Sequence, residues 1–440
     1  MQQSFLARSL QTIGGGRTFA ALFDQALVSG ANFITHVLLA RAFGIKEYGV
    51  FALAWIAVLF ANSLQYALIV IPMVSVGPKQ EPEDRPSYYG SVLLQEVAFA
   101  LFAALIMFVS VRLSMKHFPQ WGVGNLALPL SGATLAYLLQ DFIRRYFFCT
   151  SQTKRALTTD AVGYLSQLPI LFWILHRHDA RLSNVLWIIA ATSFAGFAAC
   201  MPWYERITFN AHSFRIVFLR HWRISRWLAP TAFMQWGAGN LFNLAAPLYY
   251  GAAASAALRA ALNIVAVANI WLLGLDNVVP AHAARLMRLE GVAGMLRYIR
   301  RILLQWGGVT LVFSTVVACF ASFLLRLSYG TKYLSDVPVL RLYALLYVFV
   351  VVSLPLRAAL QALEYTAPIF WAYPAMIAFS VALAGPFVRT LGLNGALLGM
   401  CGVQLIFQGI IGIALWLRVR SLRESASQGI ESCQFQLDRG

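Results

Sequence analysis

Long apolar runs alternate with short polar segments along the whole chain, and this alternation predicts a helical membrane protein. A helix needs about 20 apolar residues to cross the ~30 Å hydrocarbon layer of a bilayer. Twelve runs approach or exceed that length, and they cover residues 18–40, 48–70, 89–111, 121–143, 159–175, 183–203, 227–250, 257–280, 303–325, 338–360, 367–388 and 393–417. We therefore expect an all-α polytopic fold of about 12 transmembrane helices.

Composition and charge agree with a membrane protein and argue against a nucleic-acid partner. The chain has 440 residues, of which 60% are hydrophobic and 12% charged, far too apolar for a water-soluble fold of this size. Its net charge of +17 is spread over short clusters between the apolar runs and forms no single patch. Roughly two-thirds of the 34 lysines and arginines fall on the side of the N-terminus. An even number of spans then places both termini in the cytoplasm.

The two halves of the chain repeat one another. Residues 32–54 and 240–261 share a helix–turn–helix pattern, in which Asn32 matches Asn240. A second match aligns Arg144 with Arg357 near the inner end of a span in each half. Such internal repeats point to duplication, and six spans per half make the repeat parallel. The expected parts are a six-helix bundle over 1–203, a basic interfacial linker over 204–226, a second six-helix bundle over 227–420 and a disordered cytoplasmic tail over 421–440.

Signatures of enzymes, cofactors and metals are missing from the sequence. Gly14-Gly15-Gly16 lacks the Lys-Ser/Thr of a phosphate-binding loop, and there is no nucleophile elbow or His-Glu-x-x-His motif. The five cysteines form no Cys-x-x-Cys pair, which argues against a zinc site and a disulfide framework. We expect neither enzymatic activity nor a bound cofactor.

Two acidic residues stand out because of their depth in predicted spans. Asp24 lies six residues into the first span and Glu96 a similar distance into the third. A charge in mid-membrane costs about 2.5–3.5 kcal/mol on insertion scales, so such residues face a wet or paired interior. They are candidates for proton or Na⁺ coupling; the alternative is a carboxylate that reaches back to the interface.

Polar residues at matching places in the two halves suggest a hydrophilic cavity. Asn32 and His36 share one helix face, and Asn240 and Asn243 occupy the corresponding positions of the second half. We expect these four side chains to line a cavity that hydrogen-bonds sugars. Ordinary interhelical hydrogen bonding is the alternative.

Three arginines are candidates for binding an anionic headgroup, because guanidinium groups grip phosphate bidentately. Arg144 and Arg357 lie at repeat-related positions, and Arg259 lies inside an otherwise apolar span. Topology determination and snorkelling to lipid phosphates are the alternative explanation.

Three stretches resemble a known family. They are LARAFGIKEYGVFAL at Leu39–Leu53, LQDFIRRYFFCTSQTKRALTTDAVGY at Leu139–Tyr164 and GAAASAALRAALNIVAVANIWLLGLDNVVPAHAARL at Gly251–Leu286. They look like segments of bacterial polysaccharide exporters, the lipid-linked oligosaccharide flippases of the multidrug/oligosaccharidyl-lipid/polysaccharide (MOP) superfamily.

The resemblance implies two six-helix bundles around a cationic cavity that opens alternately to each side of the bacterial inner membrane. It implies a polyprenyl-pyrophosphate-linked oligosaccharide as cargo, carried to the outer leaflet for exopolysaccharide, capsule or O-antigen synthesis, with coupling to an ion gradient or the membrane potential. Membrane lipid, a polysaccharide polymerase and export machinery are the partners it suggests. A cation-coupled multidrug antiporter of the same superfamily and a non-transporting scaffold of a glycan-assembly complex are the alternatives.

Overall fold

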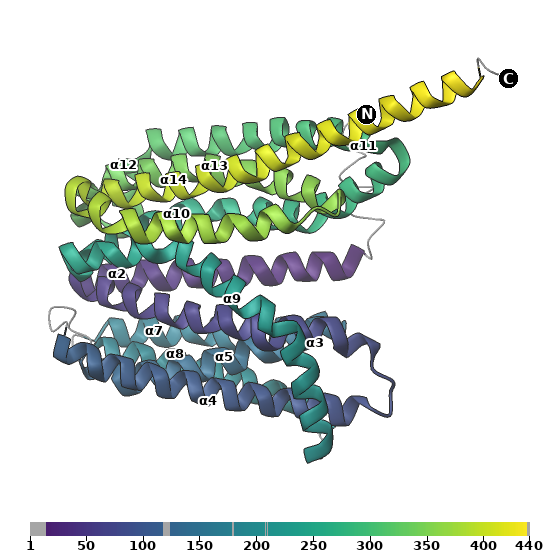
Figure 1. Ribbon diagram of the computed structural model, residues 1–440. Coiled ribbons are helices and arrows are strands. Elements are labelled where there is room, and N and C mark those ends of the chain that lie inside the picture. Colours follow the sequence, from purple (N-terminus) through teal and green to yellow (C-terminus); the bar gives the residue numbers. More distant parts are fainter. Residues whose placement is uncertain (1–14, 118–123, 178–179, 207, 209, 438–440) are drawn as a thin grey trace. The chain divides into compact units, whose positions relative to one another are not determined.

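The protein is all-helical in the part of the chain that the structure describes. This computed structural model describes residues 15–117, 124–177, 180–206, 208 and 210–437, and every regular element in these ranges is a helix (Figure 1). The α-helices are α2 (Gly15–Gln65), α3 (Ile71–Val76), α4 (Arg85–His117), α5 (Ala127–Cys149), α6 (Thr153–Asp160), α7 (Ser166–Leu175), α8 (Leu182–Cys200), α9 (Ala211–Tyr250), α10 (Ala252–Val265), α11 (Asn269–Cys319), α12 (Ala321–Tyr329), α13 (Val337–Ala362) and α14 (Ala367–Leu437).

The helices are those of a multi-pass membrane protein. Within the described residues, six helical stretches are long and apolar enough to cross a membrane, and several exceed 50 residues. Three of the longest helices contain a kink at a glycine with positive φ: Gly44 in α2, Gly291 in α11 and Gly392 in α14. Each kink divides one continuous helix into two rods, so a helix count does not equal a span count. The predicted number of twelve spans stays a prediction.

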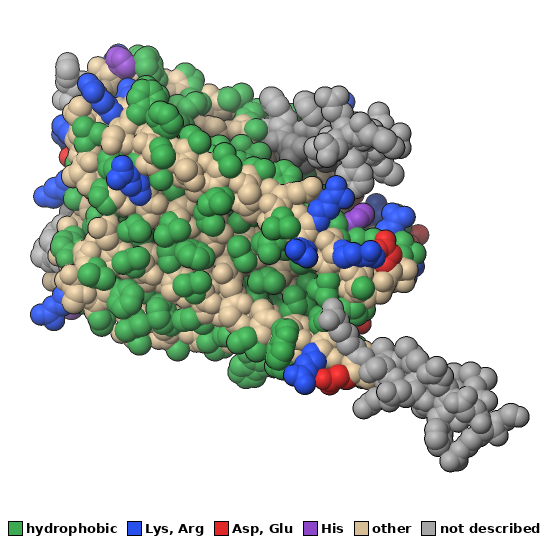
Figure 2. All heavy atoms as spheres, turned by 90° about the horizontal axis from the view of Figure 1, so that it is seen from above, with side chains coloured by type: hydrophobic (Ala, Val, Ile, Leu, Met, Phe, Trp, Pro, Cys, Tyr) green, Lys and Arg blue, Asp and Glu red, His purple; other side chains and the backbone are tan. Residues whose placement is uncertain are grey.

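Exposed apolar side chains cover the helix surfaces. On α4, Leu101, Phe102, Leu105 and Ile106 are all exposed. Figure 2 shows hydrophobic side chains across the middle of the visible face, with most Lys and Arg nearer its edges. This distribution suits a surface in contact with lipid tails, where an exposed apolar side chain carries no penalty.

The chain forms two compact units whose boundaries differ from the repeat boundaries expected from the sequence. The first unit contains Met1–Trp236 together with Tyr250–Asn263 and Arg326–Tyr333. The second contains Gly237–Tyr249, Ile264–Leu325 and Leu334–Gly440. Two short segments of the second half of the sequence are therefore packed with the first half.

Two contacts with α2 explain why these segments join the first unit. The guanidinium of Arg41 donates hydrogen bonds to the carbonyl oxygens of Ser328 (2.8 Å) and Leu327, at the C-terminal end of α12. Those carbonyls have no partner within their own helix, and the helix dipole stabilises a cation at the C-terminal end. Gly49 packs so closely on the backbone of Ala252 that a Cβ atom would overlap its carbonyl group.

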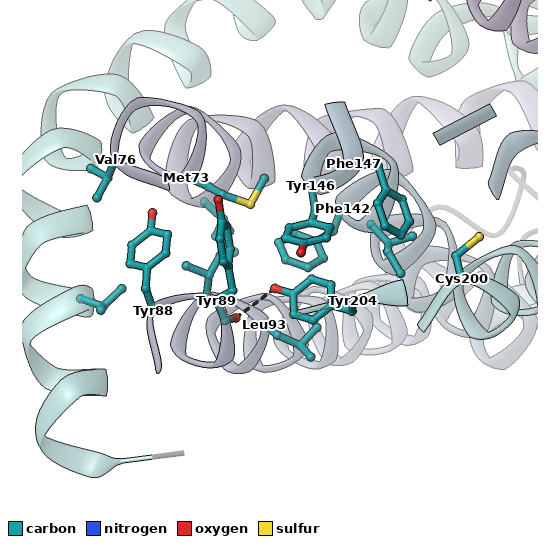
Figure 3. Close-up of a cluster of buried hydrophobic side chains, with 14 of the residues drawn as sticks. Met73, Val76, Tyr88, Tyr89, Leu93, Phe142, Tyr146, Phe147, Cys200 and Tyr204 are labelled. Atoms are coloured by element: carbon teal, nitrogen blue, oxygen red, sulfur yellow. Dashed lines mark hydrogen bonds between the residues drawn. The ribbon is translucent and has the colours of Figure 1, made fainter. Parts of the chain in front are cut away.

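An aromatic core fills the first unit near the end of α5. Tyr88 and Tyr89 of α4 pack with Tyr146 of α5 and with Tyr204, which follows α8 (Figure 3). The hydroxyl of Tyr204 donates to the carbonyl oxygen of Tyr89 at 2.9 Å. Such ring contacts add about 0.5–1.5 kcal/mol each to the gain from burial, so this core fixes α4, α5 and the chain after α8 together.

The last helix extends into the segment 421–440 that we expected to be a disordered tail. α14 continues to Leu437, and disorder of the tail stays a prediction. Arg420 pairs with Glu424 one turn later at 2.7 Å, and the following residues include the good helix formers Ala, Gln, Glu and Leu. A polar sequence without apolar periodicity can therefore still extend a helix that a membrane span has already nucleated.

The close approach of Gly49 to Ala252 predicts a specific destabilisation. Gly49→Ala should lower the free energy of unfolding by about 1–3 kcal/mol, because the backbone that it meets must move. Gly30→Ala is the matched control in the same helix. Nothing lies within 4 Å of a Cβ at Gly30, so this change should be neutral or stabilising by up to about 1 kcal/mol. Thermal unfolding of both variants in detergent measures the difference, and equal melting temperatures would contradict the packing argument.

Candidate functional site

Buried charges converge on Arg144 of α5 in the first unit. Its guanidinium lies 2.7 Å from the carboxylate of Asp24 on α2, 2.5 Å from that of Asp160 on α6 and 3.7 Å from that of Asp141 on α5. The side chains of Asp24 and Asp160 are almost completely inaccessible. Arg144 thus ties α2 and α6 to its own helix: it donates charge-assisted hydrogen bonds to Asp24 and forms ion pairs with Asp160 and Asp141.

The network continues from Asp141 to Glu96 through two amides. Asn62 donates from Nδ2 to Asp141 Oδ2 (3.1 Å) and to Gln65 Oε1 (2.9 Å). Gln65 donates from Nε2 to Glu96 Oε1 (2.6 Å) and to the carbonyl oxygen of Leu138 (2.7 Å). The two residues predicted to couple ions, Asp24 and Glu96, therefore lie at opposite ends of one chain of ion pairs and hydrogen bonds.

The network contains more acids than bases. Asp24, Asp141, Asp160 and Glu96 face two cations, Arg144 and Arg145, of which Arg145 pairs with Asp141 at 3.4 Å. Four buried carboxylate oxygens of the network have no hydrogen-bond partner among the described residues: Asp24 Oδ1, Glu96 Oε2 and both oxygens of Asp160, of which Oδ2 forms only the ion pair with Arg144. A buried carboxylate oxygen without a partner is costly. A proton on one of these carboxyl groups would add a hydrogen-bond donor to a site that has more acceptors than donors.

Irregular helix geometry lies beside this network at two points. A π-helical turn, Tyr66–Val70, begins directly after Gln65, and a second, Ala161–Leu165, begins directly after Asp160. Within the second turn, Gly163 leaves room for the amide of Gln140, which a Cβ atom would overlap. Single π-helical turns inside α-helices occur most often at functional sites. Their placement supports a functional role for the network.

A second polar cluster in the first unit surrounds His36. The Tyr48 hydroxyl lies 3.2 Å from His36 Nδ1, and the Arg259 guanidinium of α10 lies 2.9 Å from His36 Nε2. Asn263 Nδ2 donates to the hydroxyls of Tyr48 (3.4 Å) and Tyr329 (3.3 Å). Two of the predicted cavity residues, His36 and Arg259, are thus in direct contact. Asn32 is half-buried one turn before His36 on α2.

Arg259 differs from Arg144 in its electrostatic surroundings. It is half-buried, and among the residues that the structure describes no carboxylate lies within ion-pair distance of it. Its hydrogen-bond partner is an imidazole nitrogen, which accepts only when it carries no proton. Within the described part of the chain, the cluster therefore has a net positive charge without a carboxylate to balance it.

The remaining predicted residues lie in the second unit. Arg357 of α13 pairs with Asp276 of α11. Asn243 accepts a hydrogen bond of 3.3 Å from the Tyr343 hydroxyl, and Asn240 is half-buried one turn earlier on α9. These contacts show interhelical pairing for Arg357 and Asn243. Whether the four amide and imidazole residues line one cavity stays a prediction.

Sequence reasoning missed part of the acidic network. Asp141 lies near the end of the predicted span 121–143, where a carboxylate can reach the interface, whereas its side chain is largely buried and pairs with both arginines. Asp160 is the second residue of the shortest predicted span, and a π-helical turn follows it directly. The signal that was available is the motif Thr158-Thr159-Asp160, which puts an acid next to an apolar run. No group of three or more His, Cys, Asp or Glu in the described part of the chain could hold a metal ion.

Comparisons with known proteins support the fold. No family model and no curated protein matches the chain. Among solved structures, it is similar to an inward-facing multidrug resistance MATE family transporter of the MOP superfamily (TM-score 0.74, 13% identity, covering 91% of this chain and 96% of that one). It is also similar to the lipid II flippase MurJ in an inward closed conformation (TM-score 0.67, 13% identity, 91% and 87% covered).

A third similar structure shows how widely this fold varies in function. It is a MOP superfamily transporter from Pyrococcus furiosus, whose binding pocket of reverse polarity suggests a different function (TM-score 0.63, 12% identity, covering 92% of this chain and 96% of that one). At these identities the likeness establishes a MATE-like fold and no more, so the site itself must indicate the function.

The convergence of three carboxylates on one cation predicts that Arg144 is a structural requirement. Arg144→Gln should destabilise the folded protein by about 3–5 kcal/mol, because Asp24 and Asp160 lose their cation while staying buried. Arg145→Gln is the control; it is more exposed and pairs with one acid, and it should cost about 1 kcal/mol or less. Unfolding in detergent compares the two. Adding Asp160→Asn to Arg144→Gln should recover part of the loss, and a loss of equal size in both single variants would refute the network.

Proposed function

We propose that the protein is a flippase that moves a polyprenyl-pyrophosphate-linked oligosaccharide from the cytoplasmic to the outer leaflet of a bacterial inner membrane. Three observations support this proposal. The fold is MATE-like and is shared with a lipid II flippase. Three stretches of the sequence resemble polysaccharide exporters. The cluster around His36 carries a positive charge, and no carboxylate of the described residues lies within ion-pair distance of it.

The uncompensated Arg259 is the observation on which the proposal depends most. A cation at membrane depth is kept only where it has a partner or a task. Here its partner is a neutral imidazole, which binds it less strongly than an anion does. A pyrophosphate group could displace His36 and form two parallel hydrogen bonds with the guanidinium. The guanidinium would exchange one neutral acceptor for an anion that accepts two hydrogen bonds, and this exchange favours binding of the headgroup.

The cargo chemistry fits a protein with a polar path. Moving a pyrophosphate-sugar headgroup through hydrocarbon is prohibitive, whereas the prenyl tail can remain in the lipid. The amide and hydroxyl groups of Asn263, Tyr48 and Tyr329 lie close to Arg259 and are suitable partners for sugar hydroxyls. Transport would then require the two halves to open alternately to each side.

Arg144 and Arg357 are better assigned to internal pairing than to cargo binding. Three carboxylates surround the first, and Asp276 engages the second. We instead assign the Arg144 network, with Asp24 and Glu96, to coupling. Binding of a proton or Na⁺ to Asp24 or Asp160 would neutralise one of the charges that hold α5 to α2 and α6. Occupancy by the ion is thereby linked to the packing of these helices.

A multidrug antiporter is the second candidate function, and one observation favours it. The first unit buries four carboxyl groups, more than the sequence indicated, and cationic drugs need such groups. Two arginines occupy the same network, however, and leave less negative charge available to a drug. A scaffold without transport activity has less support, since it would not need two polar clusters inside a MATE-like fold.

A flipping assay tests the cargo. Arg259→Ala should reduce the initial rate of flipping of a fluorescent polyprenyl-pyrophosphate oligosaccharide in proteoliposomes by at least about tenfold, as expected for the loss of one charge-assisted contact of about 1.5–3 kcal/mol. Arg41→Ala is the control for a loss of positive charge on α2, and it should retain more of the flipping activity. If the native protein moves no glycolipid but exchanges a cationic dye, the antiporter is the correct function.

A gradient experiment tests the coupling assignment. Asp24→Asn and Glu96→Gln should make flipping independent of an imposed proton or Na⁺ gradient, because each removes an acid that binds the ion. Glu47→Gln, an exposed acid on the same helix as Asp24, should keep the native dependence. The measurement is the ratio of initial rates with and without the gradient. An unchanged ratio in both test variants would remove the network from the coupling mechanism.

A further inference from the structure

The first 16 residues of α9, Ala211–Arg226, form a helix that is firmly attached to the first unit; we call this segment the linker helix. His221 Nε2 lies 3.0 Å from the hydroxyl of Tyr88, and Ser225 donates to the carbonyl oxygen of Leu68 at 2.9 Å. Val217 is buried in the same core as Tyr88. Burial, and secondarily the charge of Arg220, lowers the pKa of His221 to about 4. The contact with Tyr88 therefore joins two neutral groups.

Val217, His221 and Ser225 are spaced four residues apart and define the attached face of the linker helix. The rest of its surface is exposed and carries two kinds of side chain. Four arginines of the segment are exposed. Five large apolar side chains are exposed as well, four in the segment and one on the residue that follows it. These residues are Arg215, Arg220, Arg223 and Arg226, with Ile216, Phe218, Leu219, Trp222 and Trp227.

The combination of arginines and large apolar side chains on the exposed face suits neither pure hydrocarbon nor pure water. Four guanidinium groups cannot be placed in hydrocarbon without a large cost. Five large apolar side chains, each about half exposed, form a patch that a purely aqueous surface rarely carries. The headgroup layer of a bilayer satisfies both, because arginines reach phosphates there while Trp, Leu and Ile enter the acyl boundary.

We propose that the linker helix binds anionic phospholipid headgroups. The charge of the segment selects anionic over zwitterionic lipid, since no Asp or Glu lies between Arg206 and Arg226. The attached face orients the helix, because the bonds to Tyr88 and Leu68 fix which side chains point away from the unit. Bound lipid would therefore hold the connection between the two repeats at the membrane surface, independently of which cargo is transported.

A lipid titration tests the proposal. The full-length protein in a neutral detergent is titrated with brominated phosphatidylglycerol or brominated phosphatidylcholine, and quenching of Trp222 is taken as the difference between the native protein and Trp222→Phe. We expect quenching by phosphatidylglycerol at far lower concentrations than by phosphatidylcholine, and loss of that preference in high salt.

The decisive variant is R215Q/R220Q/R223Q. At about 1 kcal/mol per arginine, its apparent affinity for phosphatidylglycerol should fall on the order of 100-fold. The matched control is R285Q/R288Q/R300Q on α11, which removes the same charge from exposed positions and should stay within about threefold of the native affinity. Equal quenching by the two lipids, or an unaltered affinity in R215Q/R220Q/R223Q, would overturn the proposal. So would preferential binding of a single-stranded oligonucleotide that competes with the lipid, since the surface would then recognise nucleic acid.

Discussion

The enclosure of one arginine by three acids is the interaction on which the first unit depends. A charge buried among membrane helices must be compensated where it lies, because there is no water to move it to. Arg144 satisfies this condition for Asp24, Asp141 and Asp160 at once, and so joins α2, α5 and α6. The amides of Asn62 and Gln65 extend the network to Glu96 on α4. Removal or addition of one proton therefore changes the charge balance of a network that joins α2, α4, α5 and α6.

The two polar clusters of the first unit have opposite electrostatic character. The Arg144 network holds more carboxyl groups than cations, whereas the His36 cluster holds a cation and no carboxylate within ion-pair distance among the residues described. Under the function proposed above, the acidic network would serve the coupling ion and the cationic cluster the anionic headgroup. This division suits a transporter in which one species supplies the energy and the other is moved.

The helical membrane fold was predictable from the sequence, and Asp24, Glu96 and Arg259 could be selected as candidates, because depth in an apolar run is visible in one dimension. It did not predict that Asp24 and Glu96 share one network. That link requires Asn62 and Gln65 to face α5 and α4, which depends on three-dimensional packing. Asp160 was missed because it lies at the start of a predicted span, where the sequence alone does not distinguish a buried acid from an interfacial one. The pairing of Arg144 was missed because two of its three acidic partners, Asp24 and Asp160, lie 120 residues before it and 16 after it.

The contact of Arg41 with α12 involves only backbone acceptors on the partner side. Side-chain substitutions at Leu327 and Ser328 leave both carbonyl oxygens in place, so natural variation at these positions is free to accumulate without loosening this junction. Related sequences should then conserve an arginine at position 41 and the end of the helix near residue 329, while the side chains at positions 327 and 328 vary widely. The position at which this helix ends therefore matters more to the junction than the identity of its final residues.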